Sequence, residues 1–244
     1  MSAAALATDL QRRLQRTIPE ARIEAQALPL APELALYLLA NDYPRGPLPR
    51  EAMRVIMEAP AYWAFCWASG QVLARWLLDT PGLVRGRHVL DFGSGSGVAG
   101  IAAARAGAAS VTACDLDPDA RAATAANARL HGLDIEVLAE LELTTARYDV
   151  VLLADVLYDF TNLPLLRQLT HVAPLILIAD SRVRSSALEG PLDGVVTVAR
   201  MEASTIPDLD ESPEFRHVCI YRWDRHAPPA PGAPSKPSPQ LRPA

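Results

Sequence analysis

The residues with the clearest capacity for chemistry lie at positions 89–97, which read Val-Leu-Asp-Phe-Gly-Ser-Gly-Ser-Gly. A carboxylate, Asp91, stands near the end of a strand-like apolar run, and glycines then alternate before a segment of helical composition. Glycine permits positive φ and lets a ligand approach the backbone closely. The free amides that begin the following helix favour an anionic group such as a carboxylate. The predicted ligand-binding residues of this turn are Gly93, Ser94, Gly95 and Gly97.

Two classes of cofactor fit this turn. Residues 95–100 also match the dinucleotide-binding fingerprint, with Asp115 about 20 residues past Gly95 as that fingerprint requires. A carboxylate beside the turn would repel a pyrophosphate, whereas it would attract the ammonium of an aminoacyl group. Asp91 therefore favours S-adenosylmethionine over NAD, and we expect it to face the methionine ammonium directly or through water.

The segment after the next strand-like run supplies candidates for the nucleoside. Asp115 stands where that run ends, and a carboxylate there can accept both ribose hydroxyls. Asp117, just before Pro118, is the structural alternative, since an acid there is equally a helix N-cap. We expect Leu116 to lie against the adenine. Glu140 is a candidate for the adenine amine, with a solvated loop acid as the alternative.

A second group of candidates could act on an amine. Asp155 follows the apolar run 148–154, and at the carboxyl end of a strand it would lie beside the cofactor, where it could attract and orient an ammonium. Tyr158 could shape the channel for that amine. The alternative is a turn-capping Asp155 and a core Tyr158; the position after a strand favours the catalytic role. Trp67 either contacts cofactor or substrate, or packs in the core.

The elements that must position these residues alternate along the chain. Strand-like segments are predicted at 88–92, 110–114, 135–138, 148–154 and 175–179, and helices at 70–78, 98–106, 118–130 and 163–170. Segments 195–198 and 218–223 are expected to pair as an antiparallel hairpin at the edge. The predicted fold class is α/β, a Rossmann-like, doubly wound, mostly parallel seven-stranded sheet.

We expect three parts along the chain. Residues 1–60, with a helix at 3–16 followed by several prolines, form a helical N-terminal extension, and residues 61–226 form the main domain. Residues 227–244 are rich in Pro and Ala and are expected to be disordered. Four aromatic residues crowd the start of the main domain and are expected to pack in the core: Tyr62, Trp63, Phe65 and Trp67.

The composition of the chain argues against several classes of binding partner. A formal net charge of −5 disfavours nucleic acid as a partner. The three cysteines are far apart and the histidines lack metal spacing, so neither disulfides nor a metal are expected. No apolar run approaches the roughly 20 residues of a membrane helix, and the first residues lack the pattern of a signal peptide. A cytoplasmic protein without membrane association is expected.

With these residues in place, the chain resembles the class I, seven-strand S-adenosylmethionine-dependent methyltransferases over residues 61–223. Residues 63–71 (Trp-Ala-Phe-Cys-Trp-Ala-Ser-Gly-Gln) and 154–159 (Ala-Asp-Val-Leu-Tyr-Asp) are similar to the electron transfer flavoprotein β-subunit lysine methyltransferases, whose bacterial members are often labelled nicotinamide N-methylase-like. The shared features are an Asp-x-x-Tyr motif, matched by Asp155 and Tyr158, and a preceding Trp, matched by Trp67. The chain departs from that pattern at residues 67–70 and 180–182.

The resemblance implies N-methylation of a lysine on a protein partner, either the β-subunit of electron transfer flavoprotein or a ribosomal protein. Two alternatives remain, the first of which only the nicotinamide label of that family suggests. One is N-methylation of a small-molecule amine, and the other is a catalytically silent cofactor-binding fold that serves as an interaction module. The intact set of acidic and glycine residues argues against loss of catalysis.

Overall fold

The computed structural model describes residues 3–43, 50–141 and 148–227. Its centre is a seven-stranded sheet with the strand order β5-β4-β3-β6-β7-β9-β8. The strands are β3 (His88–Phe92), β4 (Ser110–Cys114), β5 (Glu136–Leu138), β6 (Val150–Ala154), β7 (Leu175–Asp180), β8 (Val196–Glu202) and β9 (His217–Asp224). Strands β3 to β7 pair in parallel, whereas β9 is antiparallel to both β7 and β8. The predicted fold class is confirmed, including the antiparallel hairpin at the edge.

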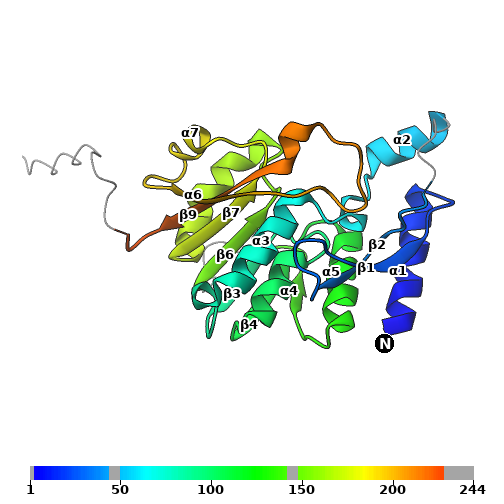
Figure 1. Ribbon diagram of the computed structural model, residues 1–244, viewed down its shortest axis with the longest axis horizontal. Helices are drawn as coiled ribbons and strands as arrows, with labels where there is room; N and C mark the ends of the chain where they lie inside the picture. The colour runs from blue at the N-terminus through cyan, green and yellow to red at the C-terminus, as the bar shows by residue number, and fades with distance from the viewer. Residues whose placement is uncertain (1–2, 44–49, 142–147, 228–244) are drawn as a thin grey trace, which may run out of the picture.

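Helices cover both faces of this sheet because its central strands are apolar on both sides. In β6, Val150 and Leu152 join one core cluster, and Val151 and Leu153 join another. One face carries α3 (Ala68–Asp79), α4 (Val98–Arg105) and α5 (Pro118–Leu130), and the other carries α6 (Leu163–Val172) and α7 (Ser185–Leu188) (Figure 1). Short 3-10 turns are η1 (Tyr62–Ala64), η2 (Pro81–Leu83), η3 (Phe160–Asn162) and η4 (Pro213–Arg216).

The N-terminal extension contains the expected helical segments and, in addition, a hairpin that was not predicted. It contains α1 (Ala3–Thr17), a hairpin of β1 (Ile23–Ala27) and β2 (Ala35–Leu39), and α2 (Arg50–Glu58). Strand β2 has an almost unbroken apolar sequence, which hides the alternation that identifies an isolated hairpin. The hairpin docks on α5, where the Tyr37 amide donates to Asn127 Oδ1 at 2.7 Å.

The aromatic cluster before α3 does not pack uniformly in the core. Trp63 is 2% exposed and fills the space between η1 and α5, whereas Tyr62 is 48% exposed. The expectation of core packing was therefore wrong for Tyr62, because a single 3-10 turn directs consecutive side chains to different sides. The predicted disordered tail lies, apart from Ala227, outside the described residues. Within the described ranges, no helix has the length and apolar character to cross a membrane.

Candidate active site

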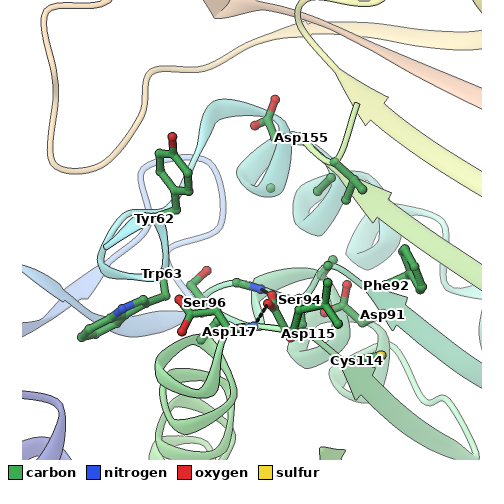
Figure 2. Close-up of a pocket in the computed structure, with 18 of the residues that line it drawn as sticks. Tyr62, Trp63, Asp91, Phe92, Ser94, Ser96, Cys114, Asp115, Asp117 and Asp155 are labelled. Atoms are coloured by element: carbon green, nitrogen blue, oxygen red, sulfur yellow. Dashed lines mark hydrogen bonds between the residues drawn. The ribbon is translucent and has the colours of Figure 1, made fainter. Parts of the chain in front are cut away.

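A pocket of about 810 Å³ opens at the carboxyl ends of β3 and β6. These two strands are neighbours, and the chain order reverses between them, since β4 lies beyond β3 and β7 beyond β6. Ligands of open α/β sheets bind at such a switch point. Figure 2 shows Asp91, Ser94, Asp115 and Asp117 on one side of this pocket and Tyr62 and Asp155 on the other.

The glycine turn is held open by hydrogen bonds to the end of β4. The amides of Gly93 and Ser94 donate to the Cys114 carbonyl at 2.9 and 3.2 Å, and the Gly95 amide donates to Asp115 Oδ2 at 2.8 Å. Gly95 has a φ of +53°, and a Cβ there would meet nothing within 4 Å. The turn therefore leaves open space where a ligand can approach its backbone.

Asp91 is a buried carboxylate below the turn, 2% exposed. Its Oδ2 accepts from the Gly100 amide of α4 at 2.8 Å. Desolvation raises the pKa of Asp91 to about 7, with the Gly100 hydrogen bond opposing and the nearby Asp115 adding to the rise. A cationic ligand group beside Asp91 would lower that pKa again, so this carboxylate suits an ammonium.

Asp115 and Asp117 have separate structural roles. Asp117 caps α5 by accepting from the Asp119 amide at 2.8 Å. The alternative role of Asp117 as a helix N-cap is therefore confirmed. Asp115 lines the pocket, and its Oδ1 accepts from the Asp117 amide at 2.9 Å. Burial raises the pKa of Asp115, against two backbone hydrogen bonds that lower it. These bonds fix the orientation of the Asp115 carboxylate, and each oxygen retains a lone pair for a ligand hydroxyl.

Asp155 occupies a strained position after β6. Its φ is +54°, which is uncommon for a residue other than glycine, and its side chain is only 10% exposed. Oδ1 accepts from Ser69 Oγ at 2.8 Å, at the beginning of α3. Desolvation, followed by the charge of Asp180, raises the pKa of Asp155 to about 7, whereas Ser69 and Arg182 lower it. A strained, buried carboxylate in a cleft is a candidate for catalysis.

Three aromatic rings stand together at the rim of the pocket. The Tyr62 ring lies 5.8 Å, centroid to centroid, from each of Trp67 and Tyr158, with edge-on geometry in both pairs. Trp67 Nε1 donates to the Tyr62 carbonyl at 3.1 Å. Tyr158 is 52% exposed, so the core alternative for this residue was wrong. The rim therefore offers aromatic surface to a substrate while remaining accessible.

All but one of the site residues predicted from the sequence line the pocket. Lining residues among them are Trp67, Asp91, Gly93, Ser94, Gly95, Asp115, Leu116, Glu140, Asp155 and Tyr158. Gly97 is not a lining residue; it precedes α4 with a φ of +82°, and a Cβ there would lie 2.9 Å from Thr124 Cγ2. Its role is to let α4 and α5 approach, which is structural.

Several residues of the site were not assigned to it from the sequence. Tyr62 and Arg182 line the pocket, and Ser69 and Asp180 contact or surround Asp155. The sequence 180–182, Asp-Ser-Arg, did carry a signal, since polar residues at the carboxyl end of a parallel strand face the same edge as the other candidates. Within the described part of the chain, no three His, Cys, Asp or Glu side chains are grouped as metal ligands.

Comparison with known proteins agrees with this geometry. The family model described as ribosomal protein L11 methyltransferase (PrmA) matches residues 75–173. The electron transfer flavoprotein beta subunit lysine methyltransferase of Mus musculus is 41% identical over 133 residues, which make up 53% of this chain and 51% of that protein. The Xenopus laevis protein of the same name is 40% identical over 139 residues, 56% of this chain and 55% of its own.

The fold also has a counterpart among solved structures. The N-methyltransferase NodS of Bradyrhizobium japonicum, solved with S-adenosyl-L-homocysteine, superposes with a TM-score of 0.50 at 16% identity, covering 65% of this chain and 86% of NodS. At that identity the likeness concerns the fold alone. The chain spans about half the length of the lysine methyltransferases that it matches. Its sheet order, its glycine turn and these similarities agree with those of the class I S-adenosylmethionine-dependent methyltransferases.

Proposed function

We propose that this protein transfers a methyl group from S-adenosylmethionine to the side-chain amine of a lysine in a protein substrate. The observation that carries the proposal is a single pocket that joins the glycine turn and Asp115 to the buried carboxylate of Asp155. The sequence similarity to lysine methyltransferases supports it.

The residues present fit this cofactor. Asp91, buried and with a raised pKa, has the character required to meet the methionine ammonium. Asp115 has the orientation to accept from the ribose hydroxyls, and Leu116 and Glu140 line the part of the pocket proposed for the adenine. Gly95 leaves the necessary open space beside the turn. When bound, S-adenosylmethionine supplies a methyl group on a sulfonium, which is an electrophile for a neutral amine.

The chain's own residues would then align the amine. Asp155 attracts the incoming ammonium to the carboxyl end of β6, and its orientation is fixed by Ser69 Oγ. Burial of Asp155 keeps water away from the reacting atoms and strengthens this attraction. Nucleophilic attack requires the lysine nitrogen first to lose one proton, which would pass to solvent at the exposed rim formed by Tyr62 and Tyr158. Tyr158 and Tyr62 form the wall along which the side chain enters.

A protein substrate fits the rim better than a small amine does. Tyr62 and Tyr158 are about half exposed, at 48% and 52%, so the entrance is accessible to a side chain projecting from a large molecule. We propose the β-subunit of electron transfer flavoprotein as the substrate class, with a ribosomal protein as the second candidate, on the strength of the named relatives. We also propose a cytoplasmic location, which is supported by the free thiols of Cys66, Cys114 and Cys219.

Transfer of labelled methyl groups tests this function. The purified protein is incubated with labelled S-adenosylmethionine and a lysate of its source cells, and protein is then separated from small molecules. Label on lysine of a discrete protein, lost with Asp155→Asn, would support the proposal. Label confined to small molecules would overturn it in favour of a small amine. The chain holds one lysine, Lys236, so Lys236→Arg removes self-methylation as a source of label.

A further inference from the structure

Arg182 approaches Asp155 without closing on it. Its Nη1 lies 3.9 Å from Asp155 Oδ1, beyond hydrogen-bond distance but close enough for a strong electrostatic interaction. Both side chains line the same pocket. An arginine free to move would normally form two parallel hydrogen bonds with a carboxylate. Something in the structure therefore holds this guanidinium back.

The restraint comes from the segment that connects β8 to β9. Arg182 Nη2 bonds to Glu211 Oε1 at 3.3 Å, and the guanidinium carbon lies 4.4 Å from the centre of the Phe215 ring. Glu211 is itself anchored, since its other oxygen accepts from Thr205 Oγ1. We call Glu211 and Phe215 the arginine clamp.

The two ends of this arrangement are fixed to the core. The backbone of Ile206 forms a two-way bridge with Cys66, at 2.7 and 2.9 Å, which ties the connecting segment to the residues before α3. On the other side, the Arg182 amide donates to Asp180 Oδ1 at 2.7 Å. The 3.9 Å separation between Arg182 and Asp155 is thus set by structure on both sides of the pocket.

Asp155 needs a cation nearby because its other neighbours oppose its charge. Asp180 of β7 is 1% exposed, and its Oδ2 is buried without a hydrogen-bond partner among the described residues. The buried Cys66 thiol adds no positive charge, and the support from α3 comes from the hydroxyl and the backbone amide of Ser69. Among the described residues with the largest effect on Asp155, Arg182 supplies the positive charge, and Glu211 partly offsets it.

We infer that Arg182 is a positioning residue: the arginine clamp holds it close enough to favour the charged form of Asp155 and too far away to occupy the place of a substrate ammonium. The inference deepens the proposed function, on which it rests. A tighter Arg182–Asp155 pair would keep the charge but block the amine. Without Arg182, the carboxylate beside Asp180 would take up a proton more readily and attract the amine less.

Arg182→Met and Glu211→Gln are expected to shift the protonation midpoint of Asp155 in opposite directions. Full-length protein labelled with ¹³C at Asp carboxyl carbons is titrated by NMR, and the Asp155 signal is assigned by its loss in Asp155→Asn. Arg182→Met should raise the Asp155 midpoint by about 1 pH unit, since it removes a nearby opposite charge. Glu211→Gln should lower the midpoint, because Arg182 then acts on Asp155 without competition. Arg182→Lys should restore a midpoint between those of Arg182→Met and the wild type.

Binding of an amine tests the second half of the inference. The probe is N-acetyl-lysine N-methylamide, measured at a pH above every midpoint with S-adenosylhomocysteine present. Glu211→Gln should weaken its binding about 3–10-fold, because the released Arg182 closes on Asp155. Arg182→Met should bind the probe at least as well as the wild type does under the same conditions.

The outcomes separate this inference from the proposed function. Midpoints that stay at the wild-type value, or that move in the same direction in Arg182→Met and Glu211→Gln, overturn the role of Arg182. Unchanged probe binding in Glu211→Gln overturns the role of the clamp. Neither readout requires methyl transfer, so a failed lysate assay with the expected midpoints would refute only the proposed reaction. If Arg182→Met does not fold, Arg182→Lys and Glu211→Gln still decide the question.

Discussion

At the scale of single residues, the site depends on two buried carboxylates, Asp91 and Asp155. Asp91 and Asp155 both have pKa values raised to about 7, in each case mainly by desolvation. A buried carboxylate without a full counter-charge lowers the stability of the folded protein. Such carboxylates are typical of functional sites, where a positively charged ligand supplies the missing counter-charge. The two positions correspond to the two cations of the proposed reaction, the methionine ammonium and the lysine ammonium.

Replacing Asp155 should abolish turnover and spare the cofactor site. Asp155→Asn keeps the shape but removes the charge that attracts the amine, so kcat/KM should fall about 100-fold or more. Affinity for S-adenosylhomocysteine, measured by calorimetry, should change little. Asp159→Asn is the matched control, since Asp159 is exposed in the same loop and its side chain hydrogen-bonds only to Thr161 among the contacts described. A variant at Asp155 with wild-type turnover would remove this residue from the mechanism.

Replacing Asp91 should stabilise the ligand-free protein at alkaline pH. The folded-state pKa of Asp91, about 7, lies above the unfolded value of about 3.9. The contribution of Asp91 to the free energy of unfolding is therefore fully present below about pH 4 and is lost as the pH rises through about 7. Asp91→Asn removes this loss, on the order of 2–4 kcal/mol at pH 8.

Thermal unfolding of both proteins checks this prediction. The variant should unfold at a higher temperature than the wild type at pH 8, and the gap should narrow toward pH 4. S-adenosylmethionine should stabilise the wild type at pH 8 and have little effect on Asp91→Asn. Parallel stability curves for the two proteins across this range would show that Asp91 is not held at a raised pKa.

At the scale of elements, the sequence determines the sheet more clearly than it determines the rim of the pocket. Strands β3 and β4 and helix α5 have the bounds that their apolar patterns predict, because each carries its own local signal. The β1–β2 hairpin was missed because the apolar residues of β2 do not alternate with polar ones. Arg182 and Tyr62 were not assigned to the site because their roles depend on contacts with segments distant in the chain. Strand-end acids can be predicted from local sequence, whereas their electrostatic partners require the tertiary structure.

The junction between the glycine turn and α5 should be intolerant of a side chain at Gly97. Alanine there combines a φ of +82° with contacts of 2.9 Å to Thr124 Cγ2 and 3.1 Å to the Thr124 Cα. Gly86→Ala is the matched control, since its φ is +71° but a Cβ would meet nothing within 4 Å. The control should cost about 1 kcal/mol of stability.

The difference between the two variants isolates the packing contact. Gly97→Ala should cost about 1–3 kcal/mol more than Gly86→Ala, because α4 and α5 must separate. Since α5 begins next to Asp115, cofactor affinity should fall in Gly97→Ala and remain unchanged in Gly86→Ala. Denaturant unfolding and calorimetry with S-adenosylhomocysteine provide the two measurements. Equal stability loss in both variants would contradict a packing role for Gly97.

At the scale of the whole molecule, the N-terminal extension is part of the structure that supports the site. Helix α1 packs on α5, and its Leu14 is fully buried in a cluster that includes Trp63. Arg13 and Arg16 also bind Asp119 in the first turn of α5, at 2.6 and 2.8 Å. The extension thereby supports the turn that carries Asp115 and Asp117.

Loss of packing in α1 should therefore destabilise the whole protein in one step. Leu14→Ala removes a fully buried side chain and should cost about 2–5 kcal/mol, whereas the exposed Arg12→Ala should change stability by less than about 0.5 kcal/mol. Because α1 and the cofactor pocket share α5, unfolding followed at α1 and at the pocket should give a single coincident transition in both variants. Bound S-adenosylhomocysteine should raise the temperature of that one transition in Leu14→Ala. Two separate transitions, with only the later one responding to the ligand, would instead show that residues 3–43 fold independently of the domain that binds the cofactor.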